Sequence, residues 1–280
     1  MKTGILHPGE MGISIAASMG NSGHEVNWVT QGRSAATCER AAEHKLRALP
    51  DLATLCAEAD ALVSVCPPAA AETVAMDVLA TGFRGLYLDA NAIAPQRACR
   101  MARAMEAAGV TFVDGSIIGG PAWQPGKTWM ILSGEGAADA AALFAAGPLE
   151  TRILEGDVGR ASALKMVFAS WTKGTTALLA AVLGTAESLG VRDELVQQWS
   201  RSGMDLVEQA PARTRGVTAK AWRFVGEMEE ISATFAGAGL PGDFHQGAAE
   251  VYRRMADFKD ASALPEMEEV LEALRGEVAD

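Results

Sequence analysis

Lys165 is the residue whose surroundings best suit acid–base chemistry. It lies near the start of the longest apolar stretch of the chain, residues 161–189. A lysine on an otherwise apolar helix loses hydration, and this lowers its pKa from about 10.4 toward neutrality. Such an ammonium can donate a proton to a carbonyl oxygen, or take it back in the reverse reaction. The alternative is that only the stem is buried and the charge extends to solvent.

A pair of glycines near the N-terminus predicts a phosphate-binding turn. Gly9 and Gly12 follow an apolar strand and open a helix, like the second and third glycines of a dinucleotide fingerprint, while His7 takes the place of the first. The helix N-terminus would offer N–H groups and a positive dipole end to phosphates. The residues expected to line this turn are Pro8, Gly9, Glu10, Met11 and Gly12.

The stretch after the second expected strand favours NADP over NAD. An NAD site carries an acidic residue about 20 positions after the glycines, which binds the ribose 2′-hydroxyl. Residues 28–34 contain no carboxylate. Gln31, Arg33 and Ser34 lie there instead, and a guanidinium fork with a hydroxyl suits a 2′-phosphate. The alternative for Arg33 is a solvated loop arginine.

Short apolar runs alternate with segments of helical period in the first half of the chain. This alternation is typical of a parallel sheet with helices on both faces. The expected strands are 3–6, 25–29, 61–66, 86–88 and 111–113, with two more at 129–132 and 151–154; the expected helices are 11–20, 52–58, 69–79 and 96–107. The fold class is therefore α/β, with a Rossmann dinucleotide-binding domain over residues 1–158.

The sequence pattern after residue 158 is typical of helices throughout, and it predicts an all-α domain over residues 159–280. The expected breaks lie at Gly190, Pro211, 237–242 and Pro265. The first helix, 161–189, joins the two domains and is too long and too apolar for an ordinary surface helix. It is either clasped by a second copy of the chain, which would make a homodimer, or central within one domain.

Composition excludes several classes of function. The 280 residues carry a net charge of -11, which disfavours nucleic acid and anionic membrane surfaces as partners. Most of the excess negative charge lies after residue 222, where the sequence has 13 acidic and 5 basic residues. Four scattered cysteines without metal-ligand spacing predict no metal site and a reducing cytoplasm. The start MKTGILHPGEMG lacks the pattern of a signal peptide, so none is expected.

Several segments, in order along the chain, resemble the β-hydroxyacid dehydrogenase and 6-phosphogluconate dehydrogenase superfamily. The resemblance is strongest to its branch of uncharacterised NADP-dependent oxidoreductases, and imine reductases are relatives. The segments that carry it are HPGEMG, SVCPP (64–68), DANAIAP (89–95), VDGSIIGGPA (113–122), GDVGRASALKMVFASWTKG (156–174) and VGEMEEISATF (225–235). The resemblance implies a nicotinamide cofactor and hydride transfer.

The resemblance also implies roles for individual residues. Lys165, which follows Gly156 and Gly159 at the family's spacing, would face the nicotinamide and act as proton donor or acceptor. Asn91 and Ala92 would lie by the nicotinamide ribose, with Asn91 also near the chemistry. The loop expected to border the adenosine and pyrophosphate is Cys66, Pro67 and Pro68. Lys173 would be an accessory to catalysis or an interface residue.

The substrate pocket departs from the pattern of hydroxyacid dehydrogenases. Those enzymes carry a serine before paired glycines and two asparagines after the lysine, whereas this chain has Ile118, Phe168 and Ala169 at those positions. Each change replaces a polar anchor for a small carboxylate with carbon, which predicts a more apolar substrate. The residues expected to touch the substrate are Ile118, Gly119, Gly120, Phe168, Ala169 and Thr172.

Two further sites have open interpretations. Glu229 and Glu230 replace a lysine that reaches the cofactor in hydroxyacid dehydrogenases, and they would either orient an iminium or lie solvated. His245 begins a helix and would be either a second proton donor or a structural residue.

The sequence therefore predicts an NADP(H)-dependent oxidoreductase acting on a carbonyl or alcohol. Imine reduction is the first alternative. Oxidative decarboxylation of a sugar acid phosphate ranks lower, because the helical half shows no cluster of basic residues for a substrate phosphate. A protein that binds NADP without turnover would have no use for Lys165.

Overall fold

The computed structural model describes residues 1–203 and 205–275. The chain divides into two compact units, Met1–Met166 and Val167–Asp280. The sequence predicted a boundary after residue 158, and the structure places it later. The reason is that Gly159 and Ser162, at the start of the first long helix, donate hydrogen bonds to Asp114 in the sheet.

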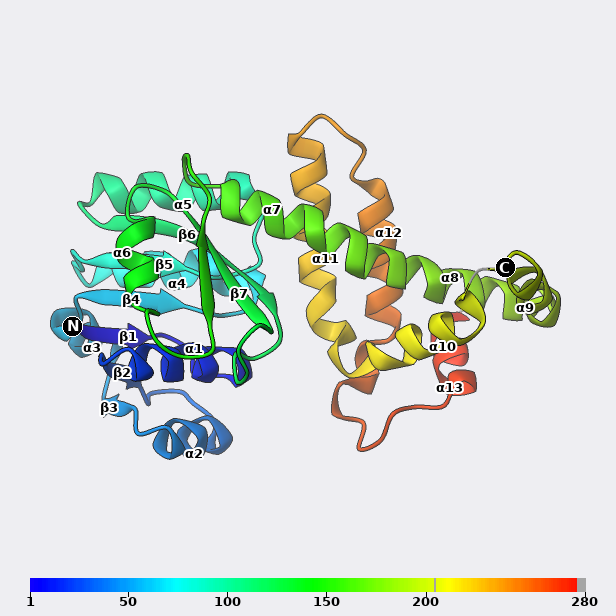
Figure 1. Cartoon of the computed structure of the whole chain (residues 1–280), viewed down its shortest axis with the longest axis horizontal. Coiled ribbons are helices and arrows are strands. Elements are labelled where there is room, and N and C mark those ends of the chain that lie inside the picture. Colours follow the sequence, from blue (N-terminus) through cyan, green and yellow to red (C-terminus); the bar gives the residue numbers. More distant parts are fainter. Residues whose placement is uncertain (204, 276–280) are drawn as a thin grey trace. The chain divides into compact units, whose positions relative to one another are not determined.

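One eight-stranded sheet forms the centre of the first unit, in the order β3-β2-β1-β4-β5-β6-β7-β8 (Figure 1). Neighbouring strands are parallel except β6 and β7, which are antiparallel. The strands are β1 (Lys2–Ile5), β2 (Glu25–Val29), β3 (Arg47–Leu49), β4 (Ala61–Ser64), β5 (Leu86–Asp89), β6 (Thr111–Gly119), β7 (Thr128–Ser133) and β8 (Glu150–Ile153). The order reverses between β1 and β4, and ligands of such sheets bind at the carboxyl ends of the strands beside that point.

Side chains alternate across the sheet, so that two cores form on its two faces. Ile5 and Leu88 lie in the core that also holds side chains of α1, α2 and α6. Leu62 and Tyr87 lie in the opposite core, with side chains of α3, α4 and α5. These helices are α1 (Glu10–Asn21), α2 (Ala35–Glu43), α3 (Leu52–Glu58), α4 (Pro68–Ala80), α5 (Pro95–Ala107) and α6 (Ala137–Ala142).

The predicted fold class is confirmed, with an α/β first unit and a helical second one. The sequence analysis missed three short elements, α2, β3 and α6. It also ended the sixth strand near Val113, whereas β6 continues to Gly119 because its second half pairs with the antiparallel β7.

Helices make up the second unit, and α7 (Arg160–Ala169) crosses into it from the first. A π-helical turn, Ser170–Gly174, links α7 to α8. Pro211 lies inside α10 and does not end it, contrary to the prediction, whereas helices do end near Gly190 and within 237–242. The helices are α8 (Thr175–Ser188), α9 (Arg192–Arg201), α10 (Leu206–Gly216), α11 (Ala221–Gly237), α12 (Asp243–Arg254) and α13 (Met267–Arg275), with 3-10 turns at Thr218–Lys220 and Ala256–Asp260.

The long helix is less buried than its apolarity suggests. Within the described parts of the chain, Arg160–Ser188 is the one helix whose length and composition would allow it to cross a membrane, but core helices of soluble proteins pass the same test. Only 39% of its most apolar window is buried. Trp171 is 72% exposed and Leu178 is 48% exposed, so part of its apolar surface is uncovered in one copy of the chain.

Candidate active site

The turn between β1 and α1 leaves room for a ligand against the backbone. A Cβ atom at Gly9 would meet no atom within 4 Å, whereas one at Gly12 would lie 2.0 Å from the carbonyl oxygen of His7. Gly12 is thus required for α1 to begin so close to the turn, and Gly9 keeps the backbone accessible. No side chain caps the N-terminus of α1, so its first N–H groups can receive a phosphate.

Arg33 contacts the backbone just before this turn. Its Nη2 donates to the carbonyl oxygen of Leu6 at 3.0 Å, and its Nε has no hydrogen-bond partner among the described residues. Burial lowers the pKa of Arg33. Burial, and secondarily the charge of Arg33, lower the pKa of His7 to about 4, so that His7 is neutral at pH 7. A half-buried guanidinium with an unused N–H beside a helix N-terminus fits the phosphates of a dinucleotide.

The remaining residues predicted for this end of the site lie on or beside the turn. Ser34 caps α2: its Oγ accepts from the N–H of Thr37 at 3.3 Å and lies 3.0 Å from the Thr37 hydroxyl. Gln31 and Glu10 are exposed, and Met11 is half-buried. Among the described residues, Arg33 forms no ion pair, so no carboxylate at these positions is bonded to it.

Asn91 ties the loop after β4 to the end of β5. Its Oδ1 accepts from the backbone N–H of Cys66 at 2.6 Å, and its Nδ2 donates to Ser64 at 3.1 Å and to Asp89. Both N–H groups of the amide are therefore engaged within the protein. The sequence predicted a role for Asn91 in chemistry, and this geometry makes it a positioning residue for the Cys66 loop.

Two other groups in this loop region are neutral at physiological pH. Burial raises the pKa of the Cys66 thiol to about 12, which excludes it as a nucleophile. Burial, followed by the neighbouring Asp114, raises the pKa of Asp89 to about 8. Pro67 and Pro68 begin α4, and Ala92 is half-buried, so these residues shape the edge of the sheet without adding charge.

Lys165 is held at the carboxyl end of β6. Its Nζ donates to the carbonyl oxygen of Ile117 at 2.7 Å. The sequence predicted this residue as the proton donor, and the bond places the ammonium two residues before Gly119 on the strand. The side chain is half-buried. Lys165 thus stands at the same edge of the sheet as the β1–α1 turn and the Cys66 loop.

Asp114 fixes the helix that carries Lys165, and the sequence analysis missed it. One of its carboxylate oxygens accepts from the N–H groups of Gly159 and Ser162 at 2.9 and 3.0 Å and from the Ser133 hydroxyl at 3.0 Å; the other accepts from the Ser162 hydroxyl at 2.6 Å. The Ser133 oxygen in turn accepts from the N–H of Ala161 at 3.0 Å. An aspartate inside the apolar run of β6 is the signal that would have found this network.

The loop predicted to touch substrate begins with an unusual backbone conformation. Gly119 has a φ of 122°, and a Cβ there would lie 2.3 Å from the carbonyl oxygen of Lys127. Gly120 has open space around its Cα, and its carbonyl accepts from the Thr128 hydroxyl at 2.7 Å. Ile118 is half-buried before them. The backbone of this loop is therefore fixed while its surface stays open.

Of the substrate residues predicted on the long helix, two are exposed and one is not. Phe168 is 46% exposed, and Thr172 is exposed with its hydroxyl turned back onto the helix carbonyls. Ala169 is only 1% exposed and lies in the packing of the helix. Its predicted contact with the substrate stays a prediction.

Lys173 is part of an internal ion pair in the second unit. Its Nζ pairs with Glu227 and lies 4.6 Å from the centre of the Phe224 ring. Its backbone carbonyl accepts from the Tyr252 hydroxyl at 2.8 Å. These contacts hold Lys173 within the helical unit, and the accessory catalytic or interface role that the sequence predicted stays a prediction.

His245 is packed between two phenylalanine rings. The centres of Phe235 and Phe244 lie 4.4 and 5.1 Å from its own ring centre, and its Nδ1 has no partner in the described parts of the chain. Burial lowers the pKa of His245. Of the two interpretations left open by the sequence, this environment matches the structural one.

The two neighbouring glutamates on α11, Glu229 and Glu230, differ in burial. Glu229 is half-exposed and pairs with Arg253 at 3.1 Å, so it matches the solvated alternative. Glu230 is buried, with 7% of its surface exposed. Across the described residues, no cluster of His, Cys, Asp or Glu suited to a metal ion occurs.

Comparison with known proteins decides the family. Residues 2–144 match the model of the NAD binding domain of 6-phosphogluconate dehydrogenase. The chain belongs to this family. The resemblance stated from the sequence motifs is thereby confirmed. Residues 186–255 match a domain of unknown function, DUF1932.

The 6-phosphogluconate dehydrogenase-like chain is similar to one curated relative in sequence and to solved structures of other proteins in fold. An uncharacterised 28.5 kDa protein of Methanothermus fervidus is 30% identical over 74% of this chain and 80% of its own. A 3-hydroxyisobutyrate dehydrogenase of Mycobacterium tuberculosis is 19% identical, with a TM-score of 0.69 over 98% of this chain and 99% of that one. A reductive aminase of Aspergillus terreus, in complex with NADPH and ethyl levulinate, is 18% identical, with a TM-score of 0.58 over 98% and 99%. The fold is thus one used by dehydrogenases and reductases.

Proposed function

We propose that this protein is an NADP(H)-dependent oxidoreductase that transfers a hydride between the nicotinamide and a carbonyl or alcohol substrate. The observation that carries the proposal is the contact of Lys165 Nζ with the carbonyl oxygen of Ile117, at 2.7 Å. When bound, the nicotinamide supplies the hydride chemistry. Lys165, oriented by that contact, donates a proton to the substrate oxygen in reduction and accepts it in oxidation.

Two positions that the sequence predicts to touch the substrate favour one less polar than a small hydroxyacid. Ile118 and Phe168 present carbon where hydroxyacid dehydrogenases carry polar anchors. The test is a screen that follows NADPH absorbance with β-keto acids, aldehydes, ketones and cyclic imines. Turnover of aldehydes or ketones supports the proposal, and turnover of imines alone contradicts it.

Imine reduction is the second candidate. It is favoured by the same loss of polar anchors and by the fold shared with the reductive aminase. The imine arm of the screen separates it from carbonyl reduction. The third candidate is a protein that binds NADP without turnover. In that case no member of the panel would oxidise NADPH.

Arg33 supports NADP over NAD, because no carboxylate follows β2 and its guanidinium has an unused N–H. We expect Arg33→Ala to weaken NADPH binding about 30-fold, since a hydrogen bond between charged groups contributes about 1.5–3 kcal/mol. NADH binding should change less than about threefold. Titration of nicotinamide fluorescence measures both dissociation constants. Arg84→Ala is the control, because Arg84 also donates to backbone carbonyls but precedes β5, away from the carboxyl ends of the strands. Equal losses for the two cofactors would refute the assignment.

A homodimer through the long helix is part of the proposal. Val167, Phe168, Trp171 and Leu178 are all at least 46% exposed, and a second copy of the chain would cover such an apolar surface. We expect Trp171→Glu and Leu178→Glu together to shift sedimentation of the protein from dimer to monomer. A wild-type chain that sediments as a monomer at micromolar concentration would contradict this.

We place the protein in the cytoplasm. Its four cysteines, Cys38, Cys56, Cys66 and Cys99, are all free thiols, which suits a reducing compartment. Small-molecule substrates are the expected partners, with no role for nucleic acid or membranes.

A further inference from the structure

Four polar residues form one row across β4, β5, β6 and β7. Ser64 on β4 is paired with Asp89 on β5, and Asp89 is paired with Asp114 on β6. Asp114 is paired in turn with Ser133 on β7. All four residues are fully buried. Because buried polar groups depend on partners inside the protein, the hydrogen bonds of each member decide where the row carries its charge.

The two carboxyl groups of the row differ in their hydrogen bonds. Asp114 accepts from two backbone N–H groups and from two serine hydroxyls. Asp89 accepts at Oδ1 from the Asn91 side chain, and its Oδ2 has no hydrogen-bond partner among the described residues. A buried carboxylate with few donors is costly, and two neighbouring carboxylates do not both ionise readily. This geometry leaves the negative charge on Asp114 and a proton on Asp89.

The other titratable groups that face Asp89 do not change this balance. Burial, followed by the charge of Asp114, raises the pKa of Asp89 to about 8, and the opposing effect of Arg97 on α5 is smaller. Burial also raises the pKa of the Cys66 thiol to about 12, and that of the Tyr87 hydroxyl well above its usual value, so both are neutral at pH 7. Asp89 is therefore mostly protonated at pH 7.

Asp89 fixes the direction of the Asn91 amide. The two N–H groups of this amide point to Ser64, at 3.1 Å, and to Asp89. Its oxygen is thereby left to accept from the backbone N–H of Cys66 at 2.6 Å. If the amide were turned around, its NH2 group would face the Cys66 N–H, and two donors would oppose each other. The acceptor on Asp89 thus keeps the Asn91 oxygen toward Cys66.

The row also connects two parts of the candidate site. At one end, Asn91 holds the Cys66 loop, and Arg97 holds the same loop by donating to the carbonyl oxygen of Pro68 at 2.9 Å. At the other end, Asp114 holds the start of α7, which carries Lys165. Asp89 lies between these two anchors.

We propose that Asp89 is a positioning residue for the Cys66 loop: as a neutral carboxyl group it orients the Asn91 amide that holds Cys66, and it leaves Asp114 as the single charge of the row. The proposal rests on the proposed function, because the Cys66 loop is the one expected to border the cofactor. It adds a buried residue that touches neither cofactor nor substrate.

The neutral state of Asp89 is tested by the melting temperature of the cofactor-free chain between pH 5 and pH 9. Because the pKa of Asp89 is raised in the folded state, its protonated form stabilises the fold at low pH, and this contribution is lost as the pH rises toward about 8. Asp89→Asn cannot ionise and loses nothing. We expect the melting temperature of Asp89→Asn minus that of wild type to be smallest at pH 5, to grow by about 5 °C up to pH 8, and then to level off.

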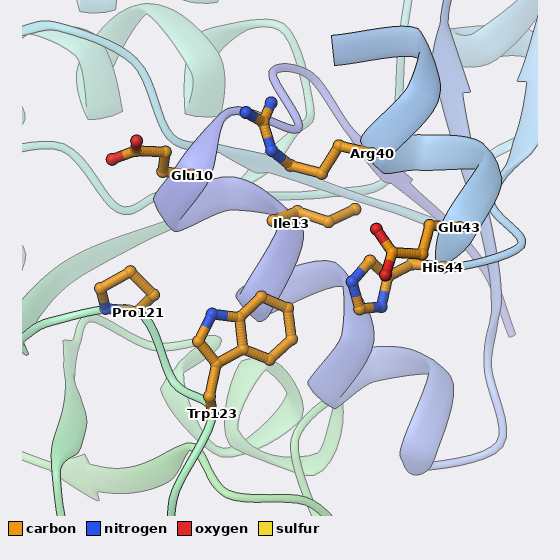
Figure 2. Close-up of a pocket in the computed structure, with 7 residues that line it drawn as sticks. All are labelled: Glu10, Ile13, Arg40, Glu43, His44, Pro121 and Trp123. Carbon is orange, nitrogen blue, oxygen red and sulfur yellow. The ribbon is translucent and has the colours of Figure 1, made fainter. Parts of the chain in front are cut away.

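Glu43→Gln is the control for loss of a carboxylate. Glu43 is exposed at the end of α2, beside a groove of about 470 Å³ that no residue of the row lines (Figure 2). Its melting temperature relative to wild type should stay flat over the same pH range. A flat difference for Asp89→Asn as well would show that Asp89 is charged, and it would overturn the proposal. This series needs only Asp89→Asn, so it decides the point even where a more disruptive variant does not fold.

The positioning role is tested by hydrogen exchange of the Cys66 amide at pH 7. Pro67 and Pro68 follow it and have no N–H, so the signal of this amide is easily assigned. Asp89→Leu leaves the Asn91 amide without its acceptor, and we expect exchange at Cys66 to become about tenfold faster. Asp89→Asn keeps an oxygen toward Asn91 and should stay within about threefold of wild type. Equal exchange in Asp89→Leu and wild type would contradict the positioning role.

Binding of NADPH separates this inference from the proposed function. We expect Asp89→Leu to weaken NADPH binding about fivefold, since a hydrogen bond that orders the loop is lost, and Asp89→Asn to restore it. If Asp89→Leu binds NADPH as wild type does although Cys66 exchanges faster, the inference is wrong while the proposed function stands. If wild type binds neither NADPH nor NADH, the proposed function fails, and the pH series and the exchange rates of the cofactor-free chain still decide the role of Asp89.

Discussion

Lys165→Met is expected to lower kcat about 1,000-fold with whichever carbonyl or imine substrate the screen identifies. Methionine keeps the length and the apolar stem of lysine but has no proton to transfer, and general acid–base groups contribute about 10²- to 10⁴-fold to rate. NADPH binding should stay within about threefold, because the phosphates are held at the β1–α1 turn and not by this side chain. Stopped-flow measurement of NADPH oxidation under single-turnover conditions checks the chemical step.

Two companion variants make this result specific. Lys165→Arg retains a positive charge near Ile117 but cannot release a proton near neutral pH, so it should remain at least 100-fold slower than wild type and lose the alkaline limb of its pH–rate profile. Lys220→Met removes an exposed lysine and should keep full activity. A kcat for Lys165→Met within fivefold of wild type would remove Lys165 from the mechanism and leave only an anchoring role toward β6.

The alternation of strands and helices was predictable because its signals are local. Apolar runs and helical periods lie within single elements, so β1, β4 and α3 were found close to their observed bounds. The missed elements lack such signals. Strand β3 has three residues, of which only Leu49 is buried, and α2 buries only Ala41. The Ser34 cap was the available sign of α2.

The spacing of residues along the chain predicted the glycines of the β1–α1 turn better than it predicted the hydrogen bonds of Asp114. Gly9 and Gly12 are recognisable because a turn imposes fixed spacing on them. Asp114 is not, because the residues it binds lie 45 and 48 positions later in the sequence. Asp89 was overlooked for the same reason, since the Asn91 amide beside it bonds to Cys66, 25 positions earlier.

Lys173 shows how one local distortion changes a prediction. Regular helical geometry placed it about 80° around the helix from Lys165, which argued against a place in the same pocket and favoured an accessory or interface role. The π-helical turn Ser170–Gly174 contains Lys173, so a spacing of 3.6 residues per turn does not hold there. In the structure this side chain pairs with Glu227. A sequence pattern that assumes 3.6 residues per turn cannot anticipate such a turn.

Asp114→Ala is expected to destabilise the first unit by about 3–5 kcal/mol, because several buried donors lose their acceptor and each unsatisfied donor costs about 1–3 kcal/mol. Asp114 has no exposed surface, and its loss leaves the N–H groups of Gly159 and Ser162 without an acceptor. We expect the melting temperature to fall by about 10 °C. Thermal denaturation followed by circular dichroism measures it, with Asp139→Ala on the short helix α6 as a control for loss of an exposed carboxylate.

Asp114→Asn separates stability from positioning. Asparagine keeps one oxygen for the two backbone N–H groups, so we expect it to restore about half of the melting temperature lost in Asp114→Ala. Both variants loosen the start of α7, and Lys165 follows three residues after Ser162 on that helix. Activity at 20 °C, where both variants stay folded, should therefore fall in the order wild type, Asp114→Asn, Asp114→Ala, with NADPH affinity unchanged. Full activity in folded Asp114→Ala would show that the contact with Ile117 alone is sufficient to place the Lys165 ammonium.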